Sequence, residues 1–373
     1  MALHCEIHTA FLYDRGGLRL LGTLGKLSRV KWERLRDDIS QAEVYIEARD
    51  TDCDTTLGLA SAGRSELVIY RGDERVWEGP VTHIAYQGNR VTVTARDVGH
   101  YVYRTIMKSE YDSSYPNIET CTNRARRILV TEMARMEAQD PPVNFLPHLV
   151  VHEHAENSGT SAHTLPWEMT CYEHIDALAA RGGLDYTTVG RAMHLWDTHF
   201  PIGQTAAITA EDFIGEVIIT EYGMELATVS AITDGKGRAG VVGGADPYYG
   251  LVEILDTAYE ESTGEDWDEE GGTQEPPSIA DMQSQAQRVL AGRNPTPVVV
   301  RVPDNSTLNP NGVLSIADLV PGTFIPLQAN LPGRAVSQMQ KLDRVTVEEL
   351  PEGETIQIVL SPAPIPESNA PDA

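Results

Sequence analysis

Three short segments between residues 66 and 95 carry the pattern that most limits how this chain can fold. In the last of them, 90–95, valine and alanine alternate strictly with threonine. A period of two places one face of a strand in a core and the other toward solvent. Turns that contain Gly72 and Gly88 separate this segment from those at 66–71 and 76–81. We therefore expect three strands of an antiparallel meander.

Similar strand-like segments occur along the rest of the chain. Residues 5–12 and 42–48 have the same character and would complete a small barrel or sandwich with the meander. Further strand-like runs lie at 184–189, 192–196, 215–220, 226–233, 296–302, 324–328, 336–350 and 355–360. The 373 residues also include 31 Gly and 22 Pro, more turn formers than a helical bundle tolerates. We predict an α+β fold that is predominantly antiparallel β.

Helical periodicity interrupts the strands in three places. Apolar residues recur every three or four positions in 117–139 and 166–180, which predicts two amphipathic helices. A third helix is expected from the capping-box pattern at Ser278 up to Gly292. It follows a run with seven acidic and no basic residues, 260–270, which is typical of a solvated loop.

At about 150 residues per domain, a chain of 373 residues is expected to form two or three domains. The changes of pattern divide it into four parts. We expect a β-rich domain at 1–105 and an α+β insertion at 106–200. A second β-rich domain follows at 201–361, interrupted by the acidic loop and helix at 256–292. Residues 362–373 hold four prolines without periodicity and predict a flexible tail.

Charge and targeting signals restrict the partners. Lys and Arg number 29 against 55 Asp and Glu, a formal net charge of −26. A surface of this sign repels phosphate backbones, so no stable nucleic-acid binding is expected. No apolar run approaches about 18 residues, and the first six residues lack the basic and apolar regions of a signal peptide. We expect a soluble protein made in a cytoplasm, without a membrane anchor.

The cysteines indicate neither a disulfide framework nor a thiolate zinc site. Cys5, Cys53, Cys121 and Cys171 lie far apart, and no C-x-x-C pair occurs. Both kinds of site require closely and regularly spaced cysteines. Four free thiols are therefore expected.

A histidine-rich segment is the strongest candidate for a chemical site. It contains His148, His152, His154, His163 and His174, with Glu153 and Glu156 between them. On a strand, His152 and His154 would point to the same side, as metal binding requires. The H-E-x-x-H pattern of zinc proteases is absent, because position 156 is glutamate. His174 lies on the apolar stripe of its helix, where a core histidine is usual. A metal-dependent hydrolase using this segment is kept as the alternative function.

A glycine motif resembles a dinucleotide-binding loop but lacks the context that such a loop needs. Residues 235–240 match G-x-G-x-x-G, but the motif needs a following helix whose amides meet a pyrophosphate. Residues 241–247 cannot open a helix, so we expect a hairpin tip instead.

The tryptophans have two different expected roles. Trp32 and Trp77 lie in strand-like segments and are expected to pack, whereas Trp267, in the acidic run, is a candidate anchor for a partner. With only 6% aromatic residues, a glycan-binding module ranks lower.

Several segments together carry a family pattern. Residues 32–44 follow an order of aromatic, Arg, acidic-Ile-Ser, small and acidic residues, and 66–81 combine E-L-V-I-Y-R-G with V-W-E-G-P-V in a hairpin pattern. Residues 249–253 and 319–322 add the motifs Y-G-L-V-E and L-V-P-G. Between about Ala10 and Ser361, these segments resemble the minor tail proteins of long-tailed actinobacterial phages that form the tail-tip hub.

The resemblance implies a homotrimer in which each chain contributes two tail-tube-like β-barrels, 1–105 and 201–361, with α-containing insertions. Two similar barrels per chain in a threefold ring present six faces, which would adapt a sixfold tail tube to a threefold tip around the DNA exit channel. The negative charge would keep DNA in transit from sticking to the channel.

The same resemblance implies where the protein acts and with what. It places the protein at the tail tip of a virion assembled in the bacterial host cytoplasm. Its expected partners are other copies of itself, the distal tail protein, other tail-tip proteins and the tape measure protein. It implies no enzyme activity, and neither catalytic residues, cofactor nor metal.

Overall fold

The computed structural model describes most of the chain, in two compact units that we treat separately. The described residues are 4–47, 51–111, 119–139, 147–152, 165–180, 183–198, 200–235, 237–256, 279–291, 293–294, 296, 298–301, 307–310, 312–331 and 334–363. The first unit comprises 1–217, 302–337 and 341–360, and the second comprises 218–301, 338–340 and 361–373.

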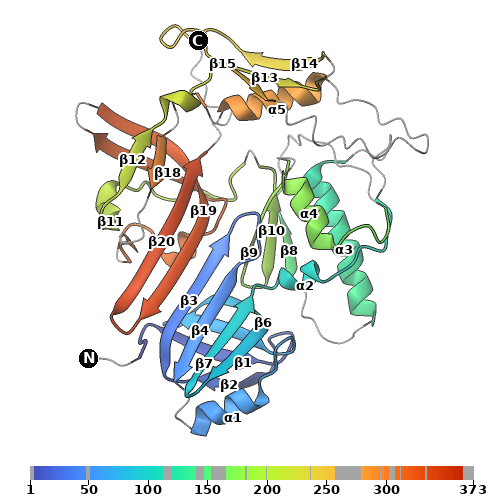
Figure 1. The fold of residues 1–373 in the computed structure, drawn as a ribbon, viewed down its shortest axis with the longest axis vertical. Coiled ribbons are helices and arrows are strands. Elements are labelled where there is room, and N and C mark those ends of the chain that lie inside the picture. Colours follow the sequence, from blue (N-terminus) through green and yellow to red (C-terminus); the bar gives the residue numbers. More distant parts are fainter. Residues whose placement is uncertain are drawn as a thin grey trace. The chain divides into compact units, whose positions relative to one another are not determined.

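A ten-stranded sheet is the frame of the first unit (Figure 1). Its strands are β1 (His8–Tyr13), β2 (Leu20–Leu24), β3 (Leu27–Leu35), β4 (Gln41–Glu47), β5 (Glu66–Arg71), β6 (Glu74–Gln87), β7 (Arg90–Arg96), β18 (Phe324–Leu331), β19 (Arg334–Leu350) and β20 (Gly353–Pro362). The order is β18-β19-β3-β4-β7-β6-β5-β1-β2, and β20 also pairs with β19. Because β19 pairs with β3, strands from opposite ends of the chain share one sheet.

The alternating pattern of the sequence explains how these strands form and which face they bury. In β4, Ala42, Val44 and Ile46 are buried and alternate with half-buried residues. The segments predicted at 66–71 and 90–95 are β5 and β7, and they pair antiparallel on either side of β6. Strands predominate over helices throughout, so the predicted α+β, predominantly antiparallel class is confirmed. The division at residues 105 and 200 stays a prediction.

Inserted between β7 and the later strands is a small α+β region within the same unit. It contains α2 (His100–Tyr103), α3 (Cys121–Gln139), β8 (His148–Val151), α4 (Cys171–Ala180), β9 (Asp185–Val189) and β10 (Ala192–Trp196). The strands form a sheet in the order β8-β10-β9, and α3 and α4 pack beside it (Figure 1). Their shared core includes Ile128, Leu129, Ile175 and Leu195. Both predicted helices and both predicted strands are confirmed.

Helix α4 begins five residues later than its apolar pattern suggested, and its cap explains why. The backbone N–H of Glu173 donates to the hydroxyl of Thr170, and the Glu173 carboxylate accepts from the backbone N–H of Thr170. This reciprocal pair is a capping box, which fixes the helix start at Cys171.

Smaller elements complete the first unit. Helix α1 (Thr51–Leu59) packs against β2. Two short helical turns, η1 (Ala210–Asp212) and η4 (Ile316–Asp318), accompany the antiparallel pair β11 (Phe213–Ile214) and β17 (Thr307–Leu308).

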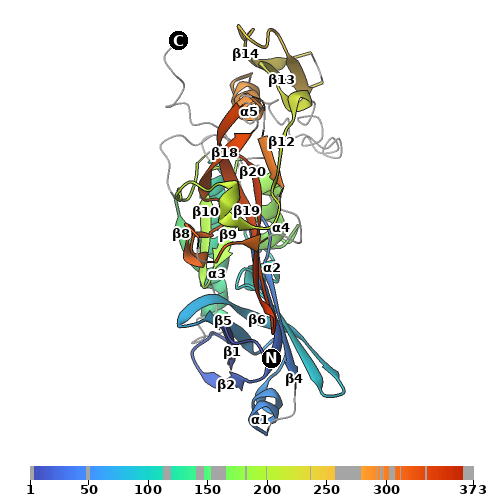
Figure 2. The ribbon, with the colours of Figure 1, turned by 90° about the vertical axis from the view of Figure 1, so that its left-hand side faces the viewer.

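The second unit is a three-stranded sheet with a helix on one face (Figure 2). The strands β13 (Val229–Thr233), β14 (Ala239–Gly243) and β15 (Glu253–Asp256) are ordered β14-β13-β15. Helix α5 (Ile279–Ala291) buries Met282 and Ala286 against Ile232, which confirms the predicted third helix. The unit also contains η2 (Gly223–Glu225) and the antiparallel pair β12 (Ile218–Glu221) and β16 (Val298–Arg301).

Candidate functional site: buried ionic junctions

Three clusters of charged side chains, each centred on a buried carboxylate, lie where distant segments of the first unit meet. We call them the Glu349 junction, the Asp185 junction and the Glu66 junction, after the carboxylate at the centre of each. A buried charge is costly unless it is paired and hydrogen-bonded. Each cluster therefore marks a place where the fold depends on one particular arrangement.

The Glu349 junction joins β19 to the start of β1. One carboxylate oxygen of Glu349 accepts from the backbone N–H groups of Glu6 and Ile7 at 2.7 and 2.9 Å. The other accepts from the backbone N–H of His8 and from its ring Nδ1, both at 2.8 Å. Burial alone would raise the pKa of Glu349, but the hydrogen bonds from His8 and the backbone outweigh it and lower the pKa below its ordinary value.

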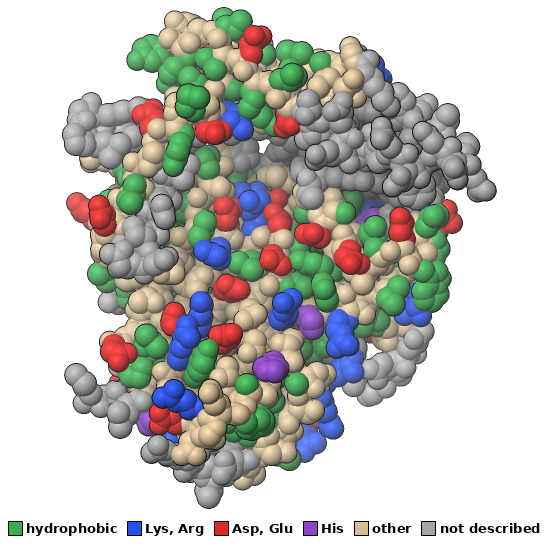
Figure 3. Space-filling model, in the orientation of Figure 1, with side chains coloured by type: hydrophobic (Ala, Val, Ile, Leu, Met, Phe, Trp, Pro, Cys, Tyr) green, Lys and Arg blue, Asp and Glu red, His purple; other side chains and the backbone are tan. Residues whose placement is uncertain are grey.

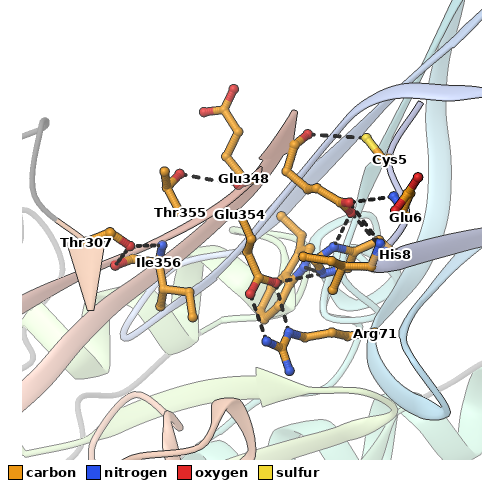
Figure 4. A network of polar contacts seen from close by, with 12 residues as sticks. Cys5, Glu6, His8, Arg71, Thr307, Glu348, Glu354, Thr355 and Ile356 are labelled. Atoms are coloured by element: carbon orange, nitrogen blue, oxygen red, sulfur yellow. Dashed lines mark hydrogen bonds and ion pairs between the residues drawn. The ribbon is translucent and has the colours of Figure 1, made fainter. Parts of the chain in front are cut away.

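Two neighbours of His8 fix the tautomer of its ring. The indole N–H of Trp32 lies 3.1 Å from Nε2 of His8. An indole nitrogen can only donate, so Nε2 must accept and the ring proton is on Nδ1, facing Glu349. Close by, Arg71 donates two hydrogen bonds of 2.8 Å to Glu354 on β20 (Figure 4). The junction thus ties β1, β3 and β5 to the C-terminal strands.

The Asp185 junction fastens the α+β insertion to the large sheet. Asp185 on β9 pairs with Lys341 on β19 and accepts from Arg36 Nη1 at 3.2 Å. Arg36 also donates to Asp343 at 2.8 Å and to Asp37 at 3.1 Å. Three carboxylates thus share two cations. Burial and the neighbouring Asp185 raise the pKa of Asp37 to about 7, and burial lowers that of Lys341.

The Glu66 junction fastens the same insertion at a second place. Glu66 is fully buried and accepts from Tyr101 Oη at 2.7 Å, from the backbone N–H of Gly16 at 2.9 Å and from Arg191 at 2.6 Å. Arg191, in the turn between β9 and β10, also reaches Glu78 on β6 at 3.2 Å. Burial raises the pKa of Glu78. The carboxylates of all three junctions are engaged by donors, an arrangement that fixes segments in place.

The histidines singled out from the sequence do not gather in the described structure. His148 is exposed on β8, and His174 is buried on α4. His152 lies just after β8 with its Nε2 3.0 Å from Nδ1 of His194 on β10, a partner that no sequence motif indicated. Burial and the neighbouring His152 lower the pKa of His194 to about 4.

The other members of that segment lie outside the described residues: His154, His163, Glu153 and Glu156. Within the described part of the chain, no group of three or more His, Cys, Asp or Glu side chains is placed to hold a metal ion. Cys5, Cys121 and Cys171 are free thiols, as predicted, and the side chain of Cys53 is outside the described part of the structure.

The remaining sequence motifs have structural explanations where they are described. The 235–240 motif begins between β13 and β14 and ends within β14, and these two strands pair antiparallel, so the predicted hairpin is confirmed. Trp32 and Trp77 are buried, as expected of packing residues. The acidic run 260–270, with Trp267, lies outside the described residues. Over the residues described, no helix has both the length and the apolar character needed to cross a membrane.

Comparison of sequences and comparison of folds give different results. No protein-family model and no curated protein matches it. The 43 kDa tail protein of prophage MuSo2 from Shewanella oneidensis superposes with a TM-score of 0.56 at 12% identity, over 96% of this chain and 100% of that one. A tail protein from Neisseria meningitidis MC58 gives 0.54 at 11%, over 96% and 97%.

A third solved structure agrees with these two. The prophage tail protein gp18 from Listeria monocytogenes EGD-e gives a TM-score of 0.55 at 8% identity, over 95% of this chain and 94% of that one. The chain has the fold of phage tail proteins. Because the match covers nearly all of each chain, this tail-protein fold includes strands from both ends of the sequence.

Proposed function

We propose that this protein is the hub of a phage tail tip, of the kind found among the minor tail proteins of long-tailed actinobacterial phages. One observation carries the proposal: the nearly complete fold match to three phage tail proteins from different bacteria. In this proposal three copies form a ring that joins a sixfold tail tube to a threefold tip.

The sheet suggests how one chain would supply two ring segments. Residues 1–105 and 201–361 would form two tube-like barrels, with 106–200 and 256–292 as insertions and 362–373 as a tail. The pairing of β3 with β19 supports a close association of the two parts, since it places strands of both in one sheet. Two such segments from each of three chains would present six faces to the tube.

The junctions fit a part that transmits force rather than one that performs chemistry. The Glu349 junction binds the first strand to the last two, and the Asp185 and Glu66 junctions bind the insertion to the sheet. Removing one partner of a buried charge pair leaves the other charge unpaired, at a cost of about 3–5 kcal/mol. Segments joined in this way resist being pulled apart. We therefore propose a non-enzymatic role and do not propose a hydrolase.

The net charge of −26 suits a channel through which DNA passes. Acidic side chains repel a phosphate backbone, although salt limits this effect to about 8 Å under physiological conditions. In the proposal, DNA is only in transit and the lasting partners are proteins: other copies of the chain, the distal tail protein, further tail-tip proteins and the tape measure protein. The site of action is the virion, assembled in the host cytoplasm.

Negative-stain imaging of the purified protein tests this proposal. We expect ring-shaped particles with threefold averages and a central opening. Particles that remain solitary at all protein concentrations would refute the hub, even though the tail-protein fold would stand.

A further inference from the structure

The α+β insertion exposes a group of aromatic and basic side chains that the hub proposal does not explain. It consists of Tyr103, Arg104, Ile106, Lys108 and Trp167, and we call it the Trp167 surface. The exposed fractions of Trp167, Ile106 and Tyr103 are 65%, 47% and 42%. Clustered exposed apolar residues on a soluble protein mark contact sites more often than single ones do.

Backbone contacts hold the segments of Ile106, Lys108 and Trp167 side by side on one small platform. The N–H of Trp167 donates to the carbonyl of Met107 at 2.9 Å, and the N–H of Met107 donates to Met169 at 3.2 Å. Ile106 and Thr170 form an antiparallel bridge beside them. Since Met107 is fully buried, the alternation of an extended segment turns Ile106 and Lys108 outward.

Trp167 has a strained backbone conformation, and the packing of its own side chain does not compensate for that strain. Its φ is 66°, in the left-handed region that favours glycine and is a genuine outlier for a bulky residue. A buried ring could offset that strain by packing, but this ring is largely in solvent. Strain of this kind is concentrated at binding and active sites. The ring already attracts one cation, because Lys108 Nζ lies 5.0 Å from its centroid.

Positive charge surrounds the platform although the chain as a whole is strongly acidic. Arg104 and Lys108 are exposed, and neither forms an ion pair with a described residue. His100 stacks on Tyr103 at 5.7 Å, and its pKa is lowered to about 4 by burial and then by Arg96 and Arg104. Figure 3 shows Lys and Arg side chains gathered along this flank, from the level of α2 down toward α1.

The acidic side chains nearest the platform are each engaged by another group of the chain. Glu168, next to Trp167, accepts a hydrogen bond from the backbone N–H of Leu165 at 3.0 Å. Glu132, behind the platform, is buried and already pairs with Arg135. Glu110 is exposed at the end of the same extended segment and also has a partner. The cations Arg104 and Lys108 thus remain available to carboxylates from outside.

We propose that the Trp167 surface docks a carboxylate-rich segment of a partner protein that also presents an apolar side chain. The carboxylates would pair with Arg104 and Lys108, and the apolar group would cover Ile106 and the ring of Trp167. Charge complementarity favours a polypeptide over DNA, because the −26 of the whole chain repels a long polyanion, whereas a short acidic segment meets only the local cations.

Fluorescence anisotropy with the full chain and a labelled peptide tests the proposal. The probe is a synthetic dodecapeptide of Glu and Asp with one central Trp, and its counterpart has Gln and Asn in their place. We expect the acidic probe to bind and the neutral one to bind at least about tenfold more weakly, with binding that falls as salt rises. Equal binding of both peptides, or stronger binding of a duplex DNA of similar charge, would overturn the proposal.

Two variants and a control locate the binding. R104E/K108E is expected to weaken binding of the acidic probe at least about tenfold. R19E/R90E makes the same charge change at exposed arginines outside the surface and is expected to bind nearly as the wild type does. Equal losses from both double variants would show a general charge effect and contradict the proposal.

W167G separates a binding role from a structural one. Glycine adopts a φ of 66° without strain, so the melting temperature should stay level or rise while binding weakens at least about threefold. A variant that melts several degrees lower, or that binds the probe undiminished, would contradict the role proposed for Trp167.

Discussion

Nδ1 of His8 and Oε2 of Glu349 lie 2.8 Å apart, although 341 residues separate them in the sequence. This contact and the hydrogen bonds to the backbone of residues 6–8 hold the first strand against β19. The position of the first strand therefore depends on contacts with residues in the last tenth of the chain. Glu349 is for this reason the most informative position to change.

Glu349→Gln should destabilise the protein by about 3 kcal/mol, because glutamine keeps only one acceptor oxygen and turns its NH2 group toward N–H donors. Chemical denaturation measures the loss as a change in the free energy of unfolding. Glu348→Gln is the matched control on the same strand, since its pair with Arg29 is part-exposed and worth at most about 1 kcal/mol. Equal losses at the two positions would show that the Glu349 junction has no special role.

The lowered pKa of Glu349 predicts a specific acid sensitivity. Between the folded and the unfolded pKa of this group, the unfolded chain binds more protons, so stability rises with pH. The contribution of Glu349 is complete above the unfolded pKa and is lost as pH falls through the folded one. Urea unfolding of wild type and Glu349→Gln between pH 3 and 7 should show the two stabilities converging in acid. Parallel curves would mean that Glu349 does not titrate in this way.

The raised pKa of Asp37 predicts the opposite dependence of folding stability on pH. Its pKa is raised to about 7, so between about 4 and 7 the folded chain holds a proton that the unfolded chain has lost, and stability falls as pH rises. Asp37→Asn removes this titration. Asparagine tolerates the φ of 57° and retains the acceptor for the backbone N–H of Tyr186. The stability of the variant relative to wild type should therefore improve from pH 5 to pH 8; an unchanged difference would contradict the assignment.

Gly79 on β6 tests the close packing of the sheet. A Cβ at this position would lie 1.9 Å from the carbonyl oxygen of Arg96, a backbone atom that cannot rotate away. Gly79→Ala should thus cost about 1–3 kcal/mol or more, seen as a lower melting temperature. Gly25→Ala, where a Cβ meets nothing within 4 Å, should change little. If both variants melt alike, β6 is not packed as closely as described.

Local pattern predicted much of this fold because the strands obey their own periodicity. Residues 90–96 alternate along the whole of β7, and each buried position matches an apolar residue. Strand β2 gives no such signal in the sequence, because its burial does not alternate regularly and it begins at two adjacent leucines, Leu20 and Leu21. The apolar stripe extends beyond the start of α4, which is set by the T-x-x-E capping pattern at Thr170.

The junctions were visible only in part. Glu349 continues the buried row of Val345 and Val347 along β19, so an acid at a core position was a readable signal. Its partner was not, because the contact with His8 exists only once β19 has paired with β3 and brought the two ends together. The pairing of Asp185 with Lys341 is hidden for the same reason, since 156 residues separate them.

The mass of the protein in solution tests the central claim most directly. Light scattering coupled to size-exclusion chromatography, at several protein concentrations, should give three times the chain mass of 40.9 kDa. A mass that stays at that of a single chain up to the highest concentration would contradict the proposal that this tail-protein fold works as a trimeric hub.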